Sequence, residues 1–472
     1  MDRPNILWIT TDQQRYDALG CMGNPHLRTP NLDRLAGEGA LLRSAFVQNP
    51  VCTPSRASML TGRYPRTTRC RQNGQTLPRD ERLLPRILAD AGYTCGLAGK
   101  LHLSACHPDV LNGKPERRVD DGYTVFDWHH DHWPWAAYGE WLRERGGSPD
   151  FTPIDGVRDV TTGPATELTS TAWACDCASR FITEHAEGPW FYSLNIFDPH
   201  HPFRIPSDRL KEWQGRVDSL PLPVHGEKEW KSKPIWQEID HGGSYGGNGT
   251  PWEAYSENDH RWIKAAYYAM IEDIDTHVGN LLDQLERTGQ AENTLVIFTS
   301  DHGELLGDHG IYLKGPHSYD CSVRVPLILR RPAHITAGLV SDALVELIDL
   351  APTIMEATGL PAEPGMQGQS LTPLLQGKTE THRDDVLCEY YNANFHHEPR
   401  AWTTMIRTED RKLVRAHGQP DGELYDLTAD PNELENRWHD PAYREDREVL
   451  LIRLCDRMAW TTDPLPLREA AY

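Results

Sequence analysis

The 472-residue sequence predicts an α/β protein with a large mixed, mostly parallel central sheet flanked by helices. Apolar runs of strand length alternate with segments that have the 3.6-residue period of amphipathic helices, which is typical of such a sheet. Four of these runs are followed at once by polar side chains of catalytic type. Because ligands bind beyond the carboxyl ends of the strands in open α/β sheets, we expect the four polar clusters to meet in one crevice.

Each predicted strand is short, apolar and rich in β-branched or aromatic residues. In chain order, the runs and the polar residues after them are Asn5 to Thr10 with Asp12 and Gln13, Tyr93 to Ala98 with Lys100 and His102, Trp190 to Phe197 with Asp198, His200 and His201, and Thr294 to Ser300 with Asp301 and His302. Turn chemistry alone also places Asp and Gly after strands. Four such clusters in one chain are harder to explain in that way.

Helical periodicity accounts for most of the chain between these strands. We expect helices over residues 30–39, 53–62, 83–91 and 341–360, another strand over residues 325–329, and either one long helix or two joined helices over residues 258–289. Two segments, residues 107–150 and 205–257, have no clean period. Long irregular segments usually carry function, so we expect both to lie around the mouth of the crevice and to set specificity.

The composition of the chain excludes some classes of binding partner. A net charge of −21 with no basic block argues against nucleic acid or an acidic membrane surface as a partner. No apolar stretch is long enough to span a bilayer, and the N-terminal apolar run is too short for a signal peptide, so we expect a cytoplasmic enzyme. Ten cysteines without a Cys-x-x-Cys pair indicate reduced thiols, and Cys175 and Cys177 are read as helix residues. Homo-oligomer formation is left open.

The segment Cys52-Thr53-Pro54-Ser55-Arg56, followed by Leu60 to Pro65, resembles the active-site motif of the sulfatase family. Residues 301–331, the Gly368 to Leu371 element and the strings around residues 411–433 also resemble this family, so the resemblance covers nearly the whole chain. It implies a catalytic α/β domain over residues 1–375. It also implies a C-terminal subdomain over residues 376–472 with a small antiparallel sheet and a helix.

In sulfatases the cysteine of this motif is oxidised to formylglycine, an aldehyde, so the resemblance implies conversion of Cys52 by a formylglycine-generating enzyme. The aldehyde hydrates to a diol. One hydroxyl attacks the sulfur of a sulfate ester and expels the alcohol, and loss of the proton from the other hydroxyl then releases sulfate. Residue 52 also precedes a predicted helix, whose free N–H groups favour an anion at that end.

The resemblance further implies a divalent metal ion held by Asp12, Asp301 and residue 52, with Gln13 and His302 in the remaining positions. Sulfatases commonly have Asp in place of Gln13 and Asn in place of His302. Oxygen ligands suit calcium, which we rank first, while the imidazole makes manganese more plausible than usual and magnesium remains an alternative. His302 could instead orient a ligand from outside the coordination sphere.

The remaining polar residues of the family site match Arg56, Lys100, His102, His200 and Lys314. Arg56 would hold the modified residue by hydrogen bonds, and Lys100 and Lys314 would bind sulfate oxygens and offset the charge of the transition state. His102 would take the diol proton in the release step. His200 would protonate the departing alcohol, because imidazole titrates near neutral pH. We expect His201 to be structural or peripheral.

Two histidine-rich strings, Asp127 to Trp133 and His396-His397, have no metal-ligand spacing. Solvated or substrate-contacting histidines are the preferred interpretation of both.

Three functions are compatible with these residues. The first is hydrolysis of a small-molecule or carbohydrate sulfate ester. The second resembles the phosphonate monoester hydrolases and phosphodiesterases of the same alkaline phosphatase superfamily, which share the Asp-Gln and Asp-His pairs. Lys100 and His102 favour the sulfatase, because those hydrolases lack this pair. The third is an inactive anion-binding protein, which predicts loss of site residues, and none is lost. The sequence does not distinguish aryl, sugar and alkyl sulfates.

Overall fold

The computed structural model describes residues 3–148, 151–468 and 470. Within these residues the largest sheet has eight strands, in the spatial order β13 (Leu339–Ser341), β2 (Ala40–Leu42), β12 (Leu327–Arg330), β10 (Thr294–Ser300), β1 (Asn5–Thr11), β8 (Trp190–Ile196), β4 (Thr94–Gly99) and β5 (Val125–Trp128). The five strands from β10 to β5 are parallel, whereas β12 is antiparallel to both its neighbours. The predicted mixed, mostly parallel sheet is confirmed.

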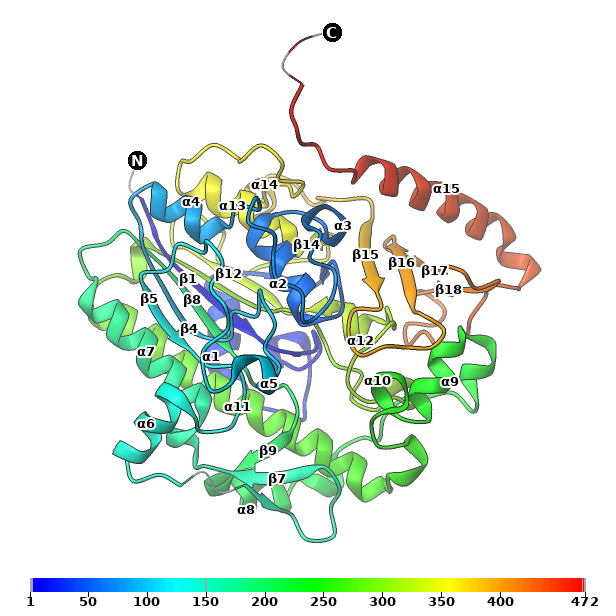
Figure 1. The fold of residues 1–472 in the computed structure, drawn as a ribbon, viewed down its shortest axis with the longest axis horizontal. Helices are drawn as coiled ribbons and strands as arrows, with labels where there is room; N and C mark the ends of the chain where they lie inside the picture. The colour runs from blue at the N-terminus through cyan, green and yellow to red at the C-terminus, as the bar shows by residue number, and fades with distance from the viewer. Residues whose placement is uncertain (1–2, 149–150, 469, 471–472) are drawn as a thin grey trace.

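Helices cover both faces of this sheet, as Figure 1 shows. Side chains along a strand alternate between the faces, and in β1 Leu7 and Ile9 pack into one core while Ile6 and Trp8 pack into the other. The first core is completed by α1 (Pro30–Glu38), α7 (Ser170–Glu184) and α11 (Glu257–Arg287), and the second by α2 (Cys52–Thr61), α4 (Leu84–Asp90) and α13 (Leu350–Ala357). Burial on both faces explains why these strands are continuously apolar.

The segment from residue 258 to 289 forms one helix rather than two. A capping box starts α11: Ser256 Oγ accepts from the N–H of Asp259 at 3.2 Å, and Asp259 Oδ2 accepts from the N–H of Ser256 at 2.8 Å.

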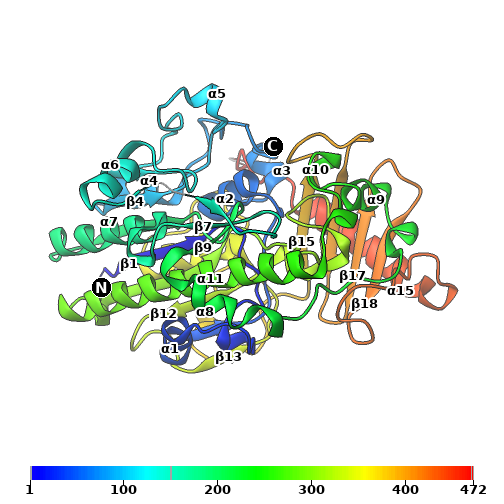
Figure 2. The ribbon, with the colours of Figure 1, turned by 90° about the horizontal axis from the view of Figure 1, so that it is seen from below.

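The C-terminal part builds a separate antiparallel sheet, as the sequence predicts. It consists of β15 (Val386–Tyr391), β16 (Trp402–Arg407), β17 (Arg411–Ala416) and β18 (Gly422–Asp426), with α15 (Arg444–Trp460) packed on it. Figure 2 shows these orange strands and the red helix beside one end of the large sheet. The exact boundary at residues 375 and 376 stays a prediction.

Two predictions from local pattern were wrong. The expected strand over residues 325–329 divides at Pro326 into β11 (Arg324–Val325), which pairs with β3 (Ala45–Phe46), and β12, which joins the large sheet. The expected helix over residues 341–360 begins only at Leu350, because the preceding β14 (Val345–Glu346) also pairs with β3. In both cases pairing with distant strands overrides the local pattern.

The irregular segments contain only short elements. Besides β5, which joins the large sheet, the helices and strands in and around residues 107–150 and 205–257 are α5 (Pro108–Leu111), α6 (Ala136–Glu144), β6 (Thr152–Pro153), β7 (Val160–Gly163), β9 (Phe203–Pro206), α8 (Leu210–Gln214), α9 (Ile235–His241) and α10 (Ser244–Gly247). Elsewhere the chain forms α3 (Pro65–Thr68), α12 (Asp320–Val323) and α14 (Thr372–Leu375). Across the described ranges, no helix has the length and apolarity needed to cross a bilayer.

Candidate active site

The carboxyl ends of β10, β1, β8 and β4 lie together, because these strands are adjacent and parallel. Backbone hydrogen bonds link the residues that follow them: Asp12 N–H donates to Asp198 O at 3.3 Å, and Lys100 N–H donates to Asn195 O at 3.0 Å. The four polar clusters therefore meet at one edge of the sheet, as predicted.

Cys52 is the first residue of α2, directly after Val51 in extended conformation. Its Sγ is buried, 3.1 Å from His302 Nε2 and 3.8 Å from Asp12 Oδ1. Ser55 Oγ donates to the backbone oxygen of Asp301 at 2.5 Å and so fixes the start of the helix against the end of β10. The N–H groups of Thr53 and Ser55 already donate to Asn73 Oδ1 at 3.0 Å and to Val51 O at 3.1 Å, so it is the dipole of α2 that favours negative charge beside residue 52.

Four side chains that could bind a metal ion lie together here and form what we call the donor cluster. One ligating atom each from Asp12, Cys52, Asp301 and His302 lies within 4.8 Å of the others, and all four residues are buried. His302 Nδ1 lies 2.8 Å from Gly303 O, so it donates there and turns Nε2 toward Cys52 Sγ and the two carboxylates. That Nε2 lies 3.6 Å from Asp12 Oδ1 and 3.7 Å from Asp301 Oδ1. Carboxylate oxygens and a neutral imidazole nitrogen fit a divalent cation.

Two buried cations bind the outer oxygens of the same carboxylates. Arg56 donates from Nε to Asp301 Oδ2 at 2.7 Å and from its terminal nitrogen to Asp12 Oδ2 at 3.2 Å, while Lys100 Nζ donates to Asp12 Oδ2. Burial alone would raise the pKa of Asp12, but the charges of Lys100 and Arg56 hold it well below its usual range. Asp12 therefore stays ionised and keeps its Oδ1 atom for the cluster.

Gln13 lies beside the cluster with its backbone in the left-handed region (φ 70°), and its N–H donates to Asp301 Oδ1 at 3.1 Å. Its amide oxygen accepts from Lys314 Nζ and its amide nitrogen donates to Glu304. A metal-ligating role for Gln13 stays a prediction. Glu304 lies in the family-like segment over residues 301–331, and its hydrogen bond from Gln13 Nε2 orients the Gln13 amide.

Lys314 and His200 form a second polar pair. Lys314 Nζ donates to His200 Nε2 at 2.8 Å, and His200 Nδ1 contacts His201 O at 2.5 Å. Burial and the neighbouring Lys314 lower the pKa of His200 well below its ordinary value. The ring is therefore neutral and held on both sides. The His201 ring stacks on it with centroids 4.1 Å apart, and His201 Nδ1 lies 3.3 Å from Gln13 Nε2, so a structural or peripheral role for His201 stays a prediction.

His102 lies in a loop with left-handed backbone (φ 58°). Glu116 holds this loop: its carboxylate accepts from the N–H groups of His102 at 2.6 Å, Leu103 at 2.9 Å and Ser104 at 3.1 Å, and from the Trp128 indole at 2.7 Å. The sequence analysis missed Glu116, because it lies in the irregular segment over residues 107–150 and no local pattern marks it. Burial, followed by Lys100 and His130, lowers the pKa of His102.

The histidine-rich strings differ from the prediction. His129 and His132 are buried rather than solvated, because His129 lies among aromatic rings and His132 Nε2 contacts His200 O at 2.9 Å. His130 is half-buried, with its ring 4.7 Å from that of His102. His397 is fully buried and contacts Asp240, whereas His396 is exposed.

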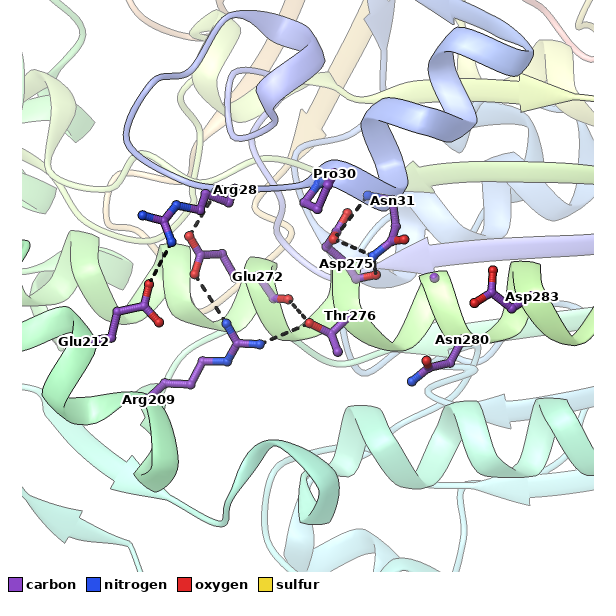
Figure 3. Close-up of a pocket in the computed structure, with 11 residues that line it drawn as sticks. Arg28, Pro30, Asn31, Arg209, Glu212, Glu272, Asp275, Thr276, Asn280 and Asp283 are labelled. Carbon is purple, nitrogen blue, oxygen red and sulfur yellow. Dashed lines mark hydrogen bonds and ion pairs between the residues drawn. The ribbon is translucent and has the colours of Figure 1, made fainter.

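The pocket drawn in Figure 3 lies elsewhere, between the start of α1 and α11. Its side chains pair with one another: Asn31 and Asp275 are hydrogen bonded, and Arg28 and Arg209 approach Glu212 and Glu272 respectively. Its lining contains none of the candidate site residues.

Comparison with known proteins identifies the class of this site. Residues 4–360 match the Sulfatase family, and residues 307–459 match the family described as N-sulphoglucosamine sulphohydrolase, C-terminal. The fold and the site define an ester hydrolase of the alkaline phosphatase superfamily. Because the first match covers more than half of the chain, the protein belongs to the sulfatase family. Sulfatases are metal-dependent enzymes, and the donor cluster around Cys52 could hold a metal ion.

Individual relatives span almost the full chain. The choline-sulfatase of Rhizobium meliloti is 30% identical, with 95% of this chain and 85% of the relative covered. The N-acetylglucosamine-6-O-sulfatase of Bacteroides thetaiotaomicron is 26% identical, with 95% and 85% covered. The crystal structure of a phosphonate monoester hydrolase from Agrobacterium radiobacter has a TM-score of 0.84 and 27% identity, with 98% and 97% covered.

Proposed function

We propose that this protein hydrolyses a small-molecule or carbohydrate sulfate monoester to an alcohol and inorganic sulfate, with a formylglycine derived from Cys52 as the nucleophile. The observation that carries the proposal is the position of Cys52 Sγ at the start of α2, inside a buried group of metal-ligating side chains. In this structure Sγ stands in for the oxygen atoms of the hydrated aldehyde. The diol supplies an attacking hydroxyl and a second hydroxyl whose deprotonation releases sulfate.

One divalent ion would be held by Asp12, Asp301, His302 and the modified residue 52, with Gln13 as a further ligand. When bound, it would supply positive charge that favours the ionised form of a diol oxygen. Calcium is our first candidate and manganese the second, because His302 adds a nitrogen to an otherwise oxygen-rich set. Arg56 keeps both carboxylates oriented through the hydrogen bonds to their Oδ2 atoms.

The remaining residues bind the ester and move protons. Lys100 donates to Asp12 and Lys314 donates to Gln13, so both ammonium groups lie beside the cluster and would bind the sulfate oxygens. Lys314 Nζ donates to His200 Nε2, so a proton transferred from the Lys314 ammonium to this nitrogen would make His200 the imidazolium acid that protonates the departing alcohol. His102 has a lowered pKa and is therefore neutral, the form that can accept the diol proton in the release step.

A phosphonate monoester hydrolase is the second candidate, favoured by the solved structure from Agrobacterium radiobacter. Lys100 and His102 support the first candidate. The N-acetylglucosamine-6-O-sulfatase and choline-sulfatase relatives support a sulfate ester on a sugar or on a small alcohol.

A kinetic comparison of substrates tests the proposal. The aldehyde-bearing enzyme is assayed on an aryl sulfate, a panel of sulfated monosaccharides, choline sulfate and a phosphonate monoester. We expect a sulfate ester to have the highest kcat/KM, because contacts that act only in the transition state raise this ratio. A kcat/KM for the phosphonate ester tenfold higher than for any sulfate ester, equivalent to about 1.4 kcal/mol of transition-state preference, would overturn the proposal that the protein is a sulfatase.

A further inference from the structure

A second group of metal-ligating side chains lies beside the first. One ligating atom each from His102, Cys106 and His130 lies within 4.8 Å of the other two. The His102 and His130 rings meet edge to face at 4.7 Å, and Cys106 Sγ lies 3.4 Å from Ser104 O. His102 and Cys106 come from the loop after β4, and His130 comes from the loop after β5, so the group depends on the adjacency of these two strands.

Among the described residues, one ring nitrogen of each histidine in this group, Nδ1, lacks a hydrogen-bond partner. Within the described part of the chain, neither His102 Nδ1 nor His130 Nδ1 has a hydrogen-bond partner, although both atoms are buried. Buried polar atoms without a partner are rare and usually mark a missing water, ion or ligand. Glu116 holds the backbone of His102 and Ser104, so one side of the group is fixed before any ion arrives.

The donor types distinguish this group from the cluster around Cys52. Two imidazole nitrogens and one thiol sulfur are ligands for Zn²⁺ and other thiophilic cations, whereas calcium and magnesium require oxygen. Around zinc, with bonds of about 2.0 to 2.3 Å, ligand atoms lie about 3.5 Å apart. Side-chain rotations that bring the three atoms roughly 1 Å closer would therefore close the site, with water as the fourth ligand.

We propose that His102, Cys106 and His130 form a binding site for Zn²⁺ or a similar thiophilic cation, and that its occupation inhibits the enzyme by taking up His102. The inhibitory part rests on the proposed function, in which His102 accepts the diol proton. Binding forms one metal–sulfur bond and two metal–nitrogen bonds, and the Cys106 thiol proton is released to solvent.

Metal binding is tested first without reference to catalysis. The Cys52→Ser protein, saturated with calcium, is titrated with Cd²⁺ while thiolate-to-metal charge-transfer absorption and bound metal are measured. We expect one Cd²⁺ per chain with a sulfur charge-transfer band. Both should be lost in the additional Cys106→Ser or His130→Ala variant and kept with Cys455→Ala, which removes an exposed thiol. An unchanged band in the Cys106→Ser protein would overturn the site.

Inhibition is tested second, on the aldehyde-bearing enzyme with its best substrate. We expect Cys106→Ser to retain turnover within about twofold and to need at least tenfold more Zn²⁺ for half inhibition, with Cys455→Ala unchanged. Equal Zn²⁺ sensitivity of the Cys106→Ser and unmodified enzymes would overturn the inhibitory role. Since the Cd²⁺ titration uses an inactive background, failure of the proposed function would leave its result intact.

Discussion

Each aspartate of the active site uses its two carboxylate oxygens for different partners. The Oδ2 atoms of Asp12 and Asp301 bind Arg56, and their Oδ1 atoms face His302 Nε2 at 3.6 and 3.7 Å. A buried carboxylate without a cation is costly, so Arg56 and Lys100 are needed to keep the ligands ionised before a metal binds. The site is therefore prepared for a divalent ion by the protein's own charges.

This arrangement predicts the metal content of an aspartate variant. Asp301→Ala removes one ligand and leaves the Arg56 guanidinium beside the cluster with one partner fewer, which repels a cation. We expect the bound metal to fall below about a tenth of the unmodified level, on the tenfold to hundredfold scale known for lost contacts at metal sites. Elemental analysis measures it. Asp342→Ala, which removes an exposed partner of Arg43, is the control. Full metal content in the Asp301→Ala protein contradicts the assignment.

At the scale of elements, the loop after β4 depends on a residue outside it. Glu116 accepts hydrogen bonds from three successive N–H groups of residues 102–104 and from Trp128, the last residue of β5. Burial raises the pKa of Glu116, and the donors around it oppose this change. The carboxylate thus fixes the backbone of the loop that carries His102.

We expect Glu116→Gln to reduce kcat by about tenfold to a hundredfold with a KM change of less than threefold, because a displacement of roughly 1 Å in a catalytic group has effects of that size. The amide presents N–H groups where the backbone requires acceptors. Steady-state kinetics with circular dichroism as a folding check measures this, and Glu363→Gln, whose carboxylate pairs with Arg82, is the control. If the Glu116→Gln protein is folded and its kcat is unchanged, Glu116 does not position His102 for catalysis.

The local sequence pattern predicted correctly those strands that are buried on both faces over their whole length. Strands β1, β8 and β10 are buried on both faces and read as apolar runs, and the catalytic side chains follow them directly. The division at Pro326 and the late start of α13 arise from pairing with β3, nearly 300 residues earlier in the chain, which no local window contains. Glu116 could not be predicted for a similar reason. Its hydrogen-bond partners are the loop over residues 102–104 and Trp128 at the end of β5, and no repeating sequence pattern connects these positions with residue 116.

At the scale of the whole molecule, three distant segments meet at one buried carboxylate. Asp240 of α9 contacts His317 Nε2 at 2.7 Å and His397 Nε2 at 3.0 Å, the latter between β15 and β16. Burial would raise the pKa of Asp240, but the hydrogen bonds from these two histidines lower it to about 2. The contact joins the irregular segment over residues 205–257 to the C-terminal sheet.

We expect Asp240→Asn to lower the free energy of unfolding by about 3 to 5 kcal/mol near neutral pH, the usual cost of breaking a buried pair. Since the folded pKa is depressed, this stabilisation is present above the ordinary value of 3.8 and is lost as the pH falls toward 2. Denaturant unfolding at several pH values measures it, with the exposed Asp384→Asn as control. A difference that persists unchanged at pH 2 contradicts the linkage.

The central claim is that Cys52 becomes the catalytic aldehyde. Mass spectrometry of the peptide that contains residue 52, isolated from the native host, tests it most directly, with turnover measured on the same preparation. We predict the mass of formylglycine at position 52, activity in proportion to the converted fraction, and a folded Cys52→Ser protein without multiple turnovers. An unconverted thiol in fully active protein, or repeated turnover by Cys52→Ser, would contradict the account.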